Sequence, residues 1–140
     1  MEEQVNASKG KDAKGRSKMT FRDLIVWRKS IELAKVLYKM TRSMPDSERF
    51  GLTAQMRRAA VSIASNIAEG NARQTLKEYI YFLGIARGSI AELETQITIA
   101  QQLAMLTDTS EIMPILQEID RLLQALIRSL TNKQNTAKPR

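Results

Sequence analysis

The sequence predicts an all-α protein, an antiparallel up-down four-helix bundle with disordered basic tails. Apolar residues recur with helical spacing in four long segments, at about residues 20–44, 53–69, 75–106 and 108–130. The connections between these segments are short, which favours antiparallel neighbours. No segment shows the alternation of apolar and polar residues that is typical of a half-buried strand.

Capping residues and helix breakers set the boundaries of the first two predicted helices. Thr20 is a good N-cap and Asp23 follows three residues later, a weaker form of the capping box. Pro45 ends the first helix, because the residue before a proline avoids the helical conformation. Thr53 is the predicted N-cap of the second helix, and Gly70 is its predicted stop.

The last two predicted helices both begin with a capping box. Thr75 with Glu78 starts the third helix, and Asp108 with Glu111 starts the fourth. Pro114 falls in the first turns of the fourth helix, where its missing N–H costs little.

The chain is basic, and its charge is unevenly distributed. It has 140 residues, with 22 Lys and Arg against 15 Asp and Glu, a net charge of +7. Its length favours one folded domain, residues 20–131, between disordered basic tails at 1–19 and 132–140. Residues 20–58 carry nine basic and four acidic side chains, a net of +5, whereas residues 59–131 carry five and eight, a net of −3. This excess of positive charge and its uneven distribution favour a polyanionic partner, with nucleic acid preferred to an anionic membrane. The alternative is a basic surface without a function.

The composition also excludes several chemistries. The sequence contains neither Cys nor His, so disulfides, thiolate nucleophiles, histidine bases and the usual zinc ligands are absent. We therefore expect no metal, no cofactor and no enzymatic activity. No apolar run approaches the roughly 20 residues needed to span a bilayer, and no signal segment is recognisable. We expect a cytoplasmic protein that has no membrane partner.

The third predicted helix is apolar on two opposite sides. A bundle buries one side of each member, so the second apolar side predicts a partner, most simply another copy of the chain. Gly84 and Gly88 lie beside that side and would let a second backbone approach closely. The predicted oligomer interface comprises Tyr81, Ile85, Gly88, Ile99 and Leu103, and the same side also carries Leu106.

The first predicted helix gathers basic residues opposite its apolar side. Lys and Arg on a helical surface reach phosphates, although a solvated lysine side without function is the alternative interpretation. Three arginines of the second helix and the connection that follows it are further candidates for contact with a ligand. The predicted nucleic-acid-binding residues are Arg22, Lys29, Lys35, Lys39, Arg42, Arg57, Arg58 and Arg73.

The stretch "SIASNIAEGNAR" interrupts the second helix with polar residues, namely Ser62, Ser65, Asn66 and Glu69. A catalytic serine would need a base, and neither His nor a nearby Lys is present. A ferritin-like metal site would need Glu-x-x-His pairs. The favoured interpretation is a structural polar network that hydrogen-bonds across helices and fixes their register. Direct ligand contact by the neighbouring arginines is the remaining alternative.

Three segments carry a resemblance to a known family: "FRDLIVWRKSIELAKVLYKMT", "PDSERFGLTAQMRRAAVSIASNIAEG" and "YFLGIARGSIAELETQITIA". They resemble the four-helix-bundle proteins first noticed in intervening sequences of 23S ribosomal RNA genes, and the resemblance covers residues 21 to about 130. The sequence is also similar to the accessory variability determinant of diversity-generating retroelements. The resemblance implies a small helical bundle, commonly a ring of five subunits, that binds nucleic acid and a reverse transcriptase. It implies no catalytic residues.

Together these observations predict a non-catalytic, homo-oligomeric and pentameric basic module that binds RNA or DNA through phosphates. It would serve as an accessory subunit of a reverse transcriptase. The alternative is a stand-alone scaffold of the ribosomal-RNA-intervening-sequence type, which docks a protein partner and has no direct nucleic-acid role. Base stacking is not expected as the main binding mode, because aromatic residues are few and several fall on core stripes.

Overall fold

The computed structural model describes residues 10–11, 17–18 and 20–137. Four α-helices dominate this part of the chain: α1 (Ile25–Met40), α2 (Leu52–Asn71), α3 (Leu76–Gln102) and α4 (Ile112–Ala137). Three short 3-10 helices, η2 (Phe21–Asp23), η3 (Thr41–Ser43) and η4 (Asp46–Glu48), flank α1 or lie in the loop after it. The two-residue strands β1 (Gly10–Lys11) and β2 (Ser17–Lys18) pair in antiparallel fashion. The predicted all-α four-helix bundle is confirmed.

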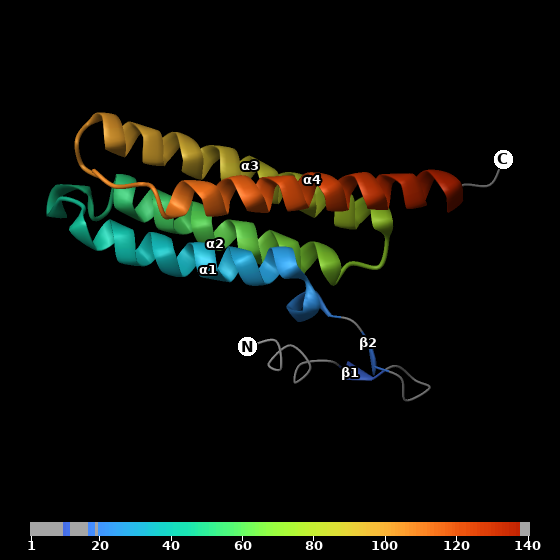
Figure 1. The fold of residues 1–140 in the computed structure, drawn as a ribbon. Coiled ribbons are helices and arrows are strands. Elements are labelled where there is room, and N and C mark those ends of the chain that lie inside the picture. The colour runs from blue at the N-terminus through green and yellow to red at the C-terminus, as the bar shows by residue number, and fades with distance from the viewer. Residues whose placement is uncertain (1–9, 12–16, 19, 138–140) are drawn as a thin grey trace.

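The helices lie side by side, and successive helices run in opposite directions (Figure 1). Each helix packs against two neighbours in the cyclic order α1, α2, α3, α4, and the α2–α3 contact is the most extensive. The core between them is apolar. Its largest fully buried side chains are Leu33, Leu37, Met56, Ile63, Ile67, Leu83, Leu93, Ile97, Ile112, Leu116, Ile119 and Leu123.

The first helix begins later and ends earlier than predicted. The Thr20 N–H donates to Asp23 Oδ2 at 2.9 Å, so the predicted pair of residues does interact, but it closes the 3-10 turn η2. Leu24 is then extended, and α1 starts at Ile25. At the other end α1 stops at Met40, and η3 follows before the extended residue Met44 precedes Pro45.

The predicted bounds of α2, about 53–69, lie within two residues of the observed Leu52–Asn71, but the predicted capping residues are wrong at both ends. Thr53 is buried and its Oγ1 makes no hydrogen bond within the described residues. Instead, Glu48 Oε1 accepts a hydrogen bond from the N–H of Leu52 at 3.1 Å and so caps the helix. Gly70 is a buried helical residue, and α2 continues to Asn71. A Cβ at Gly70 would lie 2.8 Å from the Cβ of Phe82. The glycine therefore allows the close approach of α2 and α3.

The third helix has the predicted N-cap, because Thr75 Oγ1 accepts a hydrogen bond from the N–H of Glu78. It ends at Gln102 rather than near Leu106, in a Schellman arrangement: Ala104 has φ of 59°, and Met105 N–H donates to the Ala100 carbonyl at 2.8 Å.

The fourth helix starts and ends later than predicted. The Asp108 carboxylate accepts hydrogen bonds from both the N–H and the hydroxyl of Ser110, so it caps a local turn, and α4 begins only at Ile112. The helix then runs to Ala137 instead of Leu130. Figure 1 shows this end projecting beyond the other helices. Residues 132–137, expected as tail, are helical. The predicted disordered tail at 1–19 falls mainly outside the described residues.

Candidate nucleic-acid interface

A basic surface lies at the C-terminal end of α1. Lys35 and Lys39 of α1 and Arg42 of η3 are all exposed, and we call them the lysine face. They line a hollow of about 450 Å³ together with Val36, Tyr38 and Glu111. The lining contains one acidic side chain, Glu111, against the three cations of the lysine face, so the hollow carries a net positive charge.

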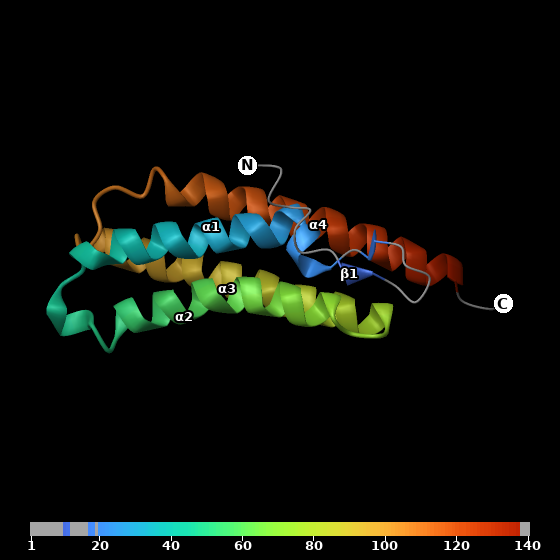
Figure 2. The same cartoon turned by 90° about the horizontal axis from the view of Figure 1, so that it is seen from below.

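A larger groove adjoins the lysine face. It has a volume of about 810 Å³ and is formed by the end of α1, the loop after η4 and the outer side of α2. Figure 2 shows the connection between α1 and α2 at one end of the bundle. We call it the arginine groove; its lining residues are Tyr38, Arg49, Phe50, Ala54, Arg57, Arg58, Val61 and Ser62. Three of these are cations and none is acidic. Tyr38 lines both hollows and joins them into one surface.

Arg57 is held in place within the arginine groove. Its Nε donates a hydrogen bond to Thr41 Oγ1 at 3.0 Å, and its guanidinium lies 4.6 Å from the centre of the Tyr38 ring. The Thr41 hydroxyl in turn donates to the Leu37 carbonyl at 2.8 Å. Because these contacts fix both the cation and the ring, this part of the groove is preorganised before any ligand arrives.

Phe50 is the most exposed large apolar side chain in the described part of the chain, with 87% of its surface accessible. The Arg49 guanidinium lies 5.3 Å from the centre of its ring. Helical periodicity could not identify Phe50 or Arg49, because both lie between two helices. The sequence gives one signal for this part of the site, a phenylalanine between an arginine and a glycine in the connection between α1 and α2.

The remaining predicted nucleic-acid contacts lie elsewhere or are paired. Lys29 Nζ forms an ion pair with Glu118 of α4 at 3.1 Å. Arg73 forms one with Glu69 at 2.7 Å and also stacks on the ring of Phe82. Arg22 lies before α1, at the opposite end of that helix from Arg42. The structure therefore brings together Lys35, Lys39, Arg42, Arg57 and Arg58, and leaves Arg22, Lys29 and Arg73 apart from them.

The polar stretch of α2 contributes a hydrogen-bonded cluster between helices. Ser62 Oγ and Ser89 Oγ of α3 lie 2.9 Å apart, and Asn66 Nδ2 donates both to Ser62 Oγ and to the Ser62 carbonyl. Ser89 was not predicted as a member. Glu69 pairs with Arg73 instead, and Ser65 is exposed. The network is thus smaller than predicted and crosses from α2 to α3.

The second apolar side of α3 is open to solvent in the single chain. Tyr81, Ile99 and Leu103 are 65%, 44% and 61% exposed, and Gly88 is also exposed. Ile85 is partly buried. We call the predicted interface residues the outer α3 stripe: Tyr81, Ile85, Gly88, Ile99 and Leu103. Leu106, predicted on the same side, is instead buried, because the left-handed turn at Ala104 redirects the chain into the core.

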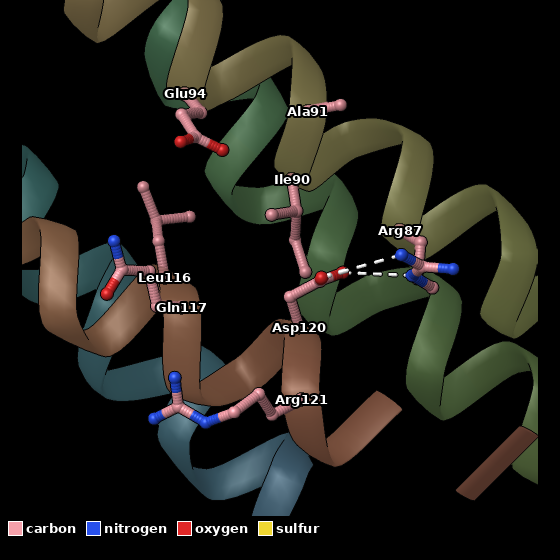
Figure 3. Close-up of a pocket in the computed structure, with 8 residues that line it drawn as sticks. All are labelled: Arg87, Ile90, Ala91, Glu94, Leu116, Gln117, Asp120 and Arg121. Atoms are coloured by element: carbon pink, nitrogen blue, oxygen red, sulfur yellow. Dashed lines mark hydrogen bonds and ion pairs between the residues drawn. The ribbon is translucent and has the colours of Figure 1, made fainter. Parts of the chain in front are cut away.

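A smaller cavity of about 310 Å³ lies between α3 and α4 (Figure 3). Arg87 reaches across it and donates two hydrogen bonds to the Asp120 carboxylate, at 2.9 and 3.4 Å. These bonds hold the pKa of Asp120 below its usual value. Glu94 and Arg121 lie away from this pair in Figure 3. Because the charges in the lining balance, we interpret the cavity as an inter-helix contact and not as a site for an anion.

The described residues contain neither a candidate metal site nor a candidate membrane span. No cluster of three or more His, Cys, Asp or Glu side chains within them could hold a metal ion. None of the described helices is long and apolar enough to cross a membrane.

Comparison with known proteins agrees with this architecture. A model of the family described as "23S rRNA-intervening sequence protein" matches residues 22–127, so the chain belongs to that family. A crystal structure from Bacteroides thetaiotaomicron, described as a protein with unknown function from the S23 ribosomal protein family, superposes with a TM-score of 0.69. It is 25% identical and the match covers 74% of this chain and 96% of that chain. A comparison with curated proteins finds no significant match.

Proposed function

We propose that the protein is a non-catalytic, homo-oligomeric module that binds RNA or DNA through its phosphates. One observation carries the proposal: the arginine groove has three cations and no acid in its lining, and it is continuous with the lysine face through Tyr38. The resulting surface presents Lys35, Lys39, Arg42, Arg49, Arg57 and Arg58. Cations that reach phosphates from a helical surface do not read base edges, so binding is only weakly sequence-specific.

The decisive experiment measures binding of a fluorescent structured RNA by polarisation, at salt concentrations between 50 and 200 mM. Release of counterions from the phosphates lowers the affinity by at least about ten-fold over this range. The triple variant Lys35→Glu, Lys39→Glu and Arg42→Glu removes the lysine face. A matched control, Lys77→Glu, Arg121→Glu and Arg128→Glu, changes the net charge equally at three exposed positions outside the surface. We expect the first variant to weaken binding far more than the second.

The outer α3 stripe supports the homo-oligomeric part of the proposal. Tyr81 and Ile99 of α3 and Leu103 at its C-cap are exposed and would be buried against another copy of the chain. The family resemblance favours five subunits. Light scattering of the purified protein at micromolar concentration measures the mass directly. A pentamer is expected, and Leu103→Lys should dissociate it; a monomer at that concentration contradicts this part.

A reverse transcriptase is the proposed protein partner, on the basis of the resemblance to accessory subunits of diversity-generating retroelements. Co-expression of the chain with a reverse transcriptase encoded beside its gene, followed by co-purification, tests this partner. The alternative is a stand-alone scaffold that docks a protein partner and has no direct nucleic-acid role, and one experimental outcome distinguishes it. It is favoured if the lysine-face variant loses a protein partner while the wild-type chain never binds nucleic acid.

A further inference from the structure

The arginine groove combines cations with exposed aromatic rings. We propose that this groove binds an unpaired nucleotide, with its base stacked on Phe50 and its phosphates held by Arg57 and Arg58. This inference rests on the proposed nucleic-acid function and specifies its ligand as single-stranded rather than duplex. Base stacking, which the aromatic content of the sequence did not favour, thereby becomes part of the binding mode.

Phe50 offers an exposed aromatic ring to a ligand. A phenylalanine that is 87% exposed contributes almost nothing to the core, and burying such a ring against an apolar surface is favourable. One face of the ring lies under the Arg49 guanidinium, 5.3 Å from the ring centre. The exposure of the ring leaves room on its other face for a flat ligand. Nucleic-acid bases stack on aromatic rings in this way without regard to sequence.

The positive charge of the arginine groove suits a phosphate ligand. Arg58 is exposed, and its guanidinium forms no ion pair with another described residue. Arg57 is its neighbour in the sequence, and its position is fixed by Thr41 and Tyr38. With no acid in the lining, the groove has unbalanced positive charge. Arginine is also suited to phosphate because its planar fork donates two parallel hydrogen bonds.

The size and the lining of the arginine groove suit a nucleotide. The volume of about 810 Å³ falls within the range of roughly 300–1,000 Å³ that is usual for sites of small ligands. The exposed side chain of Val61 adds apolar surface to the lining of the groove. A base that is paired in a duplex has its faces covered by its neighbours and cannot stack on Phe50. The exposed ring and the cations of the groove together therefore favour an unpaired segment, such as a loop or a single-stranded end of RNA.

The experiment compares three fluorescent probes with the full chain: a 12-nucleotide oligo(A), an abasic oligomer of the same length and charge, and a blunt RNA duplex. We expect oligo(A) to bind more tightly than the abasic probe by about 5- to 150-fold, which is the effect of stacking one base. Phe50→Ala should remove this difference, and Phe50→Trp should restore it. Ile25→Ala, at an exposed apolar position at the start of α1, should leave it unchanged.

The outcomes separate this inference from the proposed function. If oligo(A) and the abasic probe bind equally, or if Phe50→Ala leaves their difference intact, the stacking inference is wrong while phosphate binding stands. If neither probe nor the duplex binds, the proposed function itself fails. Binding of polyglutamate in a Phe50-dependent manner without binding of oligo(A) identifies an acidic protein segment as the occupant and overturns the inference. Dissociation of the oligomer by Phe50→Ala also overturns it, because Phe50 would then be an interface residue.

Discussion

The guanidinium of Arg57 stacks on the ring of Tyr38 and donates a hydrogen bond to the Thr41 hydroxyl, which joins α2 to the end of α1. The adjacent Arg58 is exposed and makes neither contact. Two consecutive arginines of the same groove therefore have different roles. Arg57 stabilises the fold and presents a fixed cation to the groove, whereas Arg58 is held by neither contact and can adjust to a ligand.

This difference predicts that alanine variants of the two arginines differ in how strongly they change the free energy of unfolding and the affinity for RNA. Arg57→Ala should lower the free energy of unfolding by about 1–2 kcal/mol, because it removes a cation–π contact and a partly buried hydrogen bond. Arg58→Ala should change it by less than about 0.5 kcal/mol and yet weaken RNA binding. Urea denaturation and polarisation measure the two quantities. Equal losses of stability in the two variants would contradict the assignment.

The hydrogen bond between Ser62 and Ser89 predicts an energetic coupling between α2 and α3. Each single change to Ala leaves a polar partner unsatisfied in a partly buried contact, which costs about 1 kcal/mol of unfolding free energy. The double variant should cost less than the sum of the two single variants. Ser65→Ala, at an exposed position on α2, serves as the control and should be nearly neutral. Strict additivity of the two effects would show that the cluster does not couple the helices.

The left-handed conformation of Ala104 predicts a stabilising substitution. A residue with a Cβ at φ of 59° is disfavoured relative to glycine by roughly 1 kcal/mol. Ala104→Gly should therefore raise the unfolding midpoint in urea. The matched control, Ala125→Gly in an exposed part of α4, should lower the free energy of unfolding by about 0.5–1 kcal/mol and so lower the midpoint, because glycine weakens a helix interior. A loss of stability in Ala104→Gly would exclude the left-handed turn.

The Asp120 carboxylate predicts part of the acid sensitivity of the fold. Hydrogen bonds from Arg87 lower its pKa, and one from Gln124 Nε2, at 2.7 Å, acts in the same direction. Because the folded-state pKa lies below the unfolded value of about 3.9, this stabilisation is complete above that pH. It is lost as the pH falls through the folded-state pKa.

Asp120→Asn should therefore reduce stability at pH 7 by less than about 1 kcal/mol, since the ion pair is partly exposed. It should also flatten the dependence of the urea midpoint on pH below about 4. Glu92→Gln, which changes one exposed carboxylate of α3, controls for net charge. Parallel pH profiles for the wild type and Asp120→Asn would exclude the proposed linkage.

Sequence periodicity predicted the four helices because apolar residues recur at helical spacing in each, and all four helices contribute side chains to the buried core. Boundaries were less predictable, since they depend on tertiary contacts. Gly70 looked like a helix stop, but α2 continues through it, and the missing Cβ leaves room for Phe82 of α3. Thr53 looked like an N-cap, but Glu48 supplies the hydrogen bond from the preceding turn.

The candidate site was predictable only where it lies on helices. Lys35, Lys39 and Arg42 share one side of α1 and its extension, so helical spacing placed them together. Phe50 and Arg49 have no periodicity to reveal them, because a connection brings them to the groove. Lys29 showed the opposite limitation: its helical position suggested a free cation, but Glu118 of another helix pairs with it.

The lysine face and the arginine groove are proposed to bind nucleic-acid phosphates. The most direct test is the slope of the logarithm of RNA affinity against the logarithm of salt concentration, measured for the wild type and for the triple variant at Lys35, Lys39 and Arg42. The wild type should give a steep negative slope, and the variant a slope that is shallower by about 2 to 3, roughly one unit for each lost phosphate contact. Binding that is absent, or that is independent of salt in the wild type, would contradict the claim.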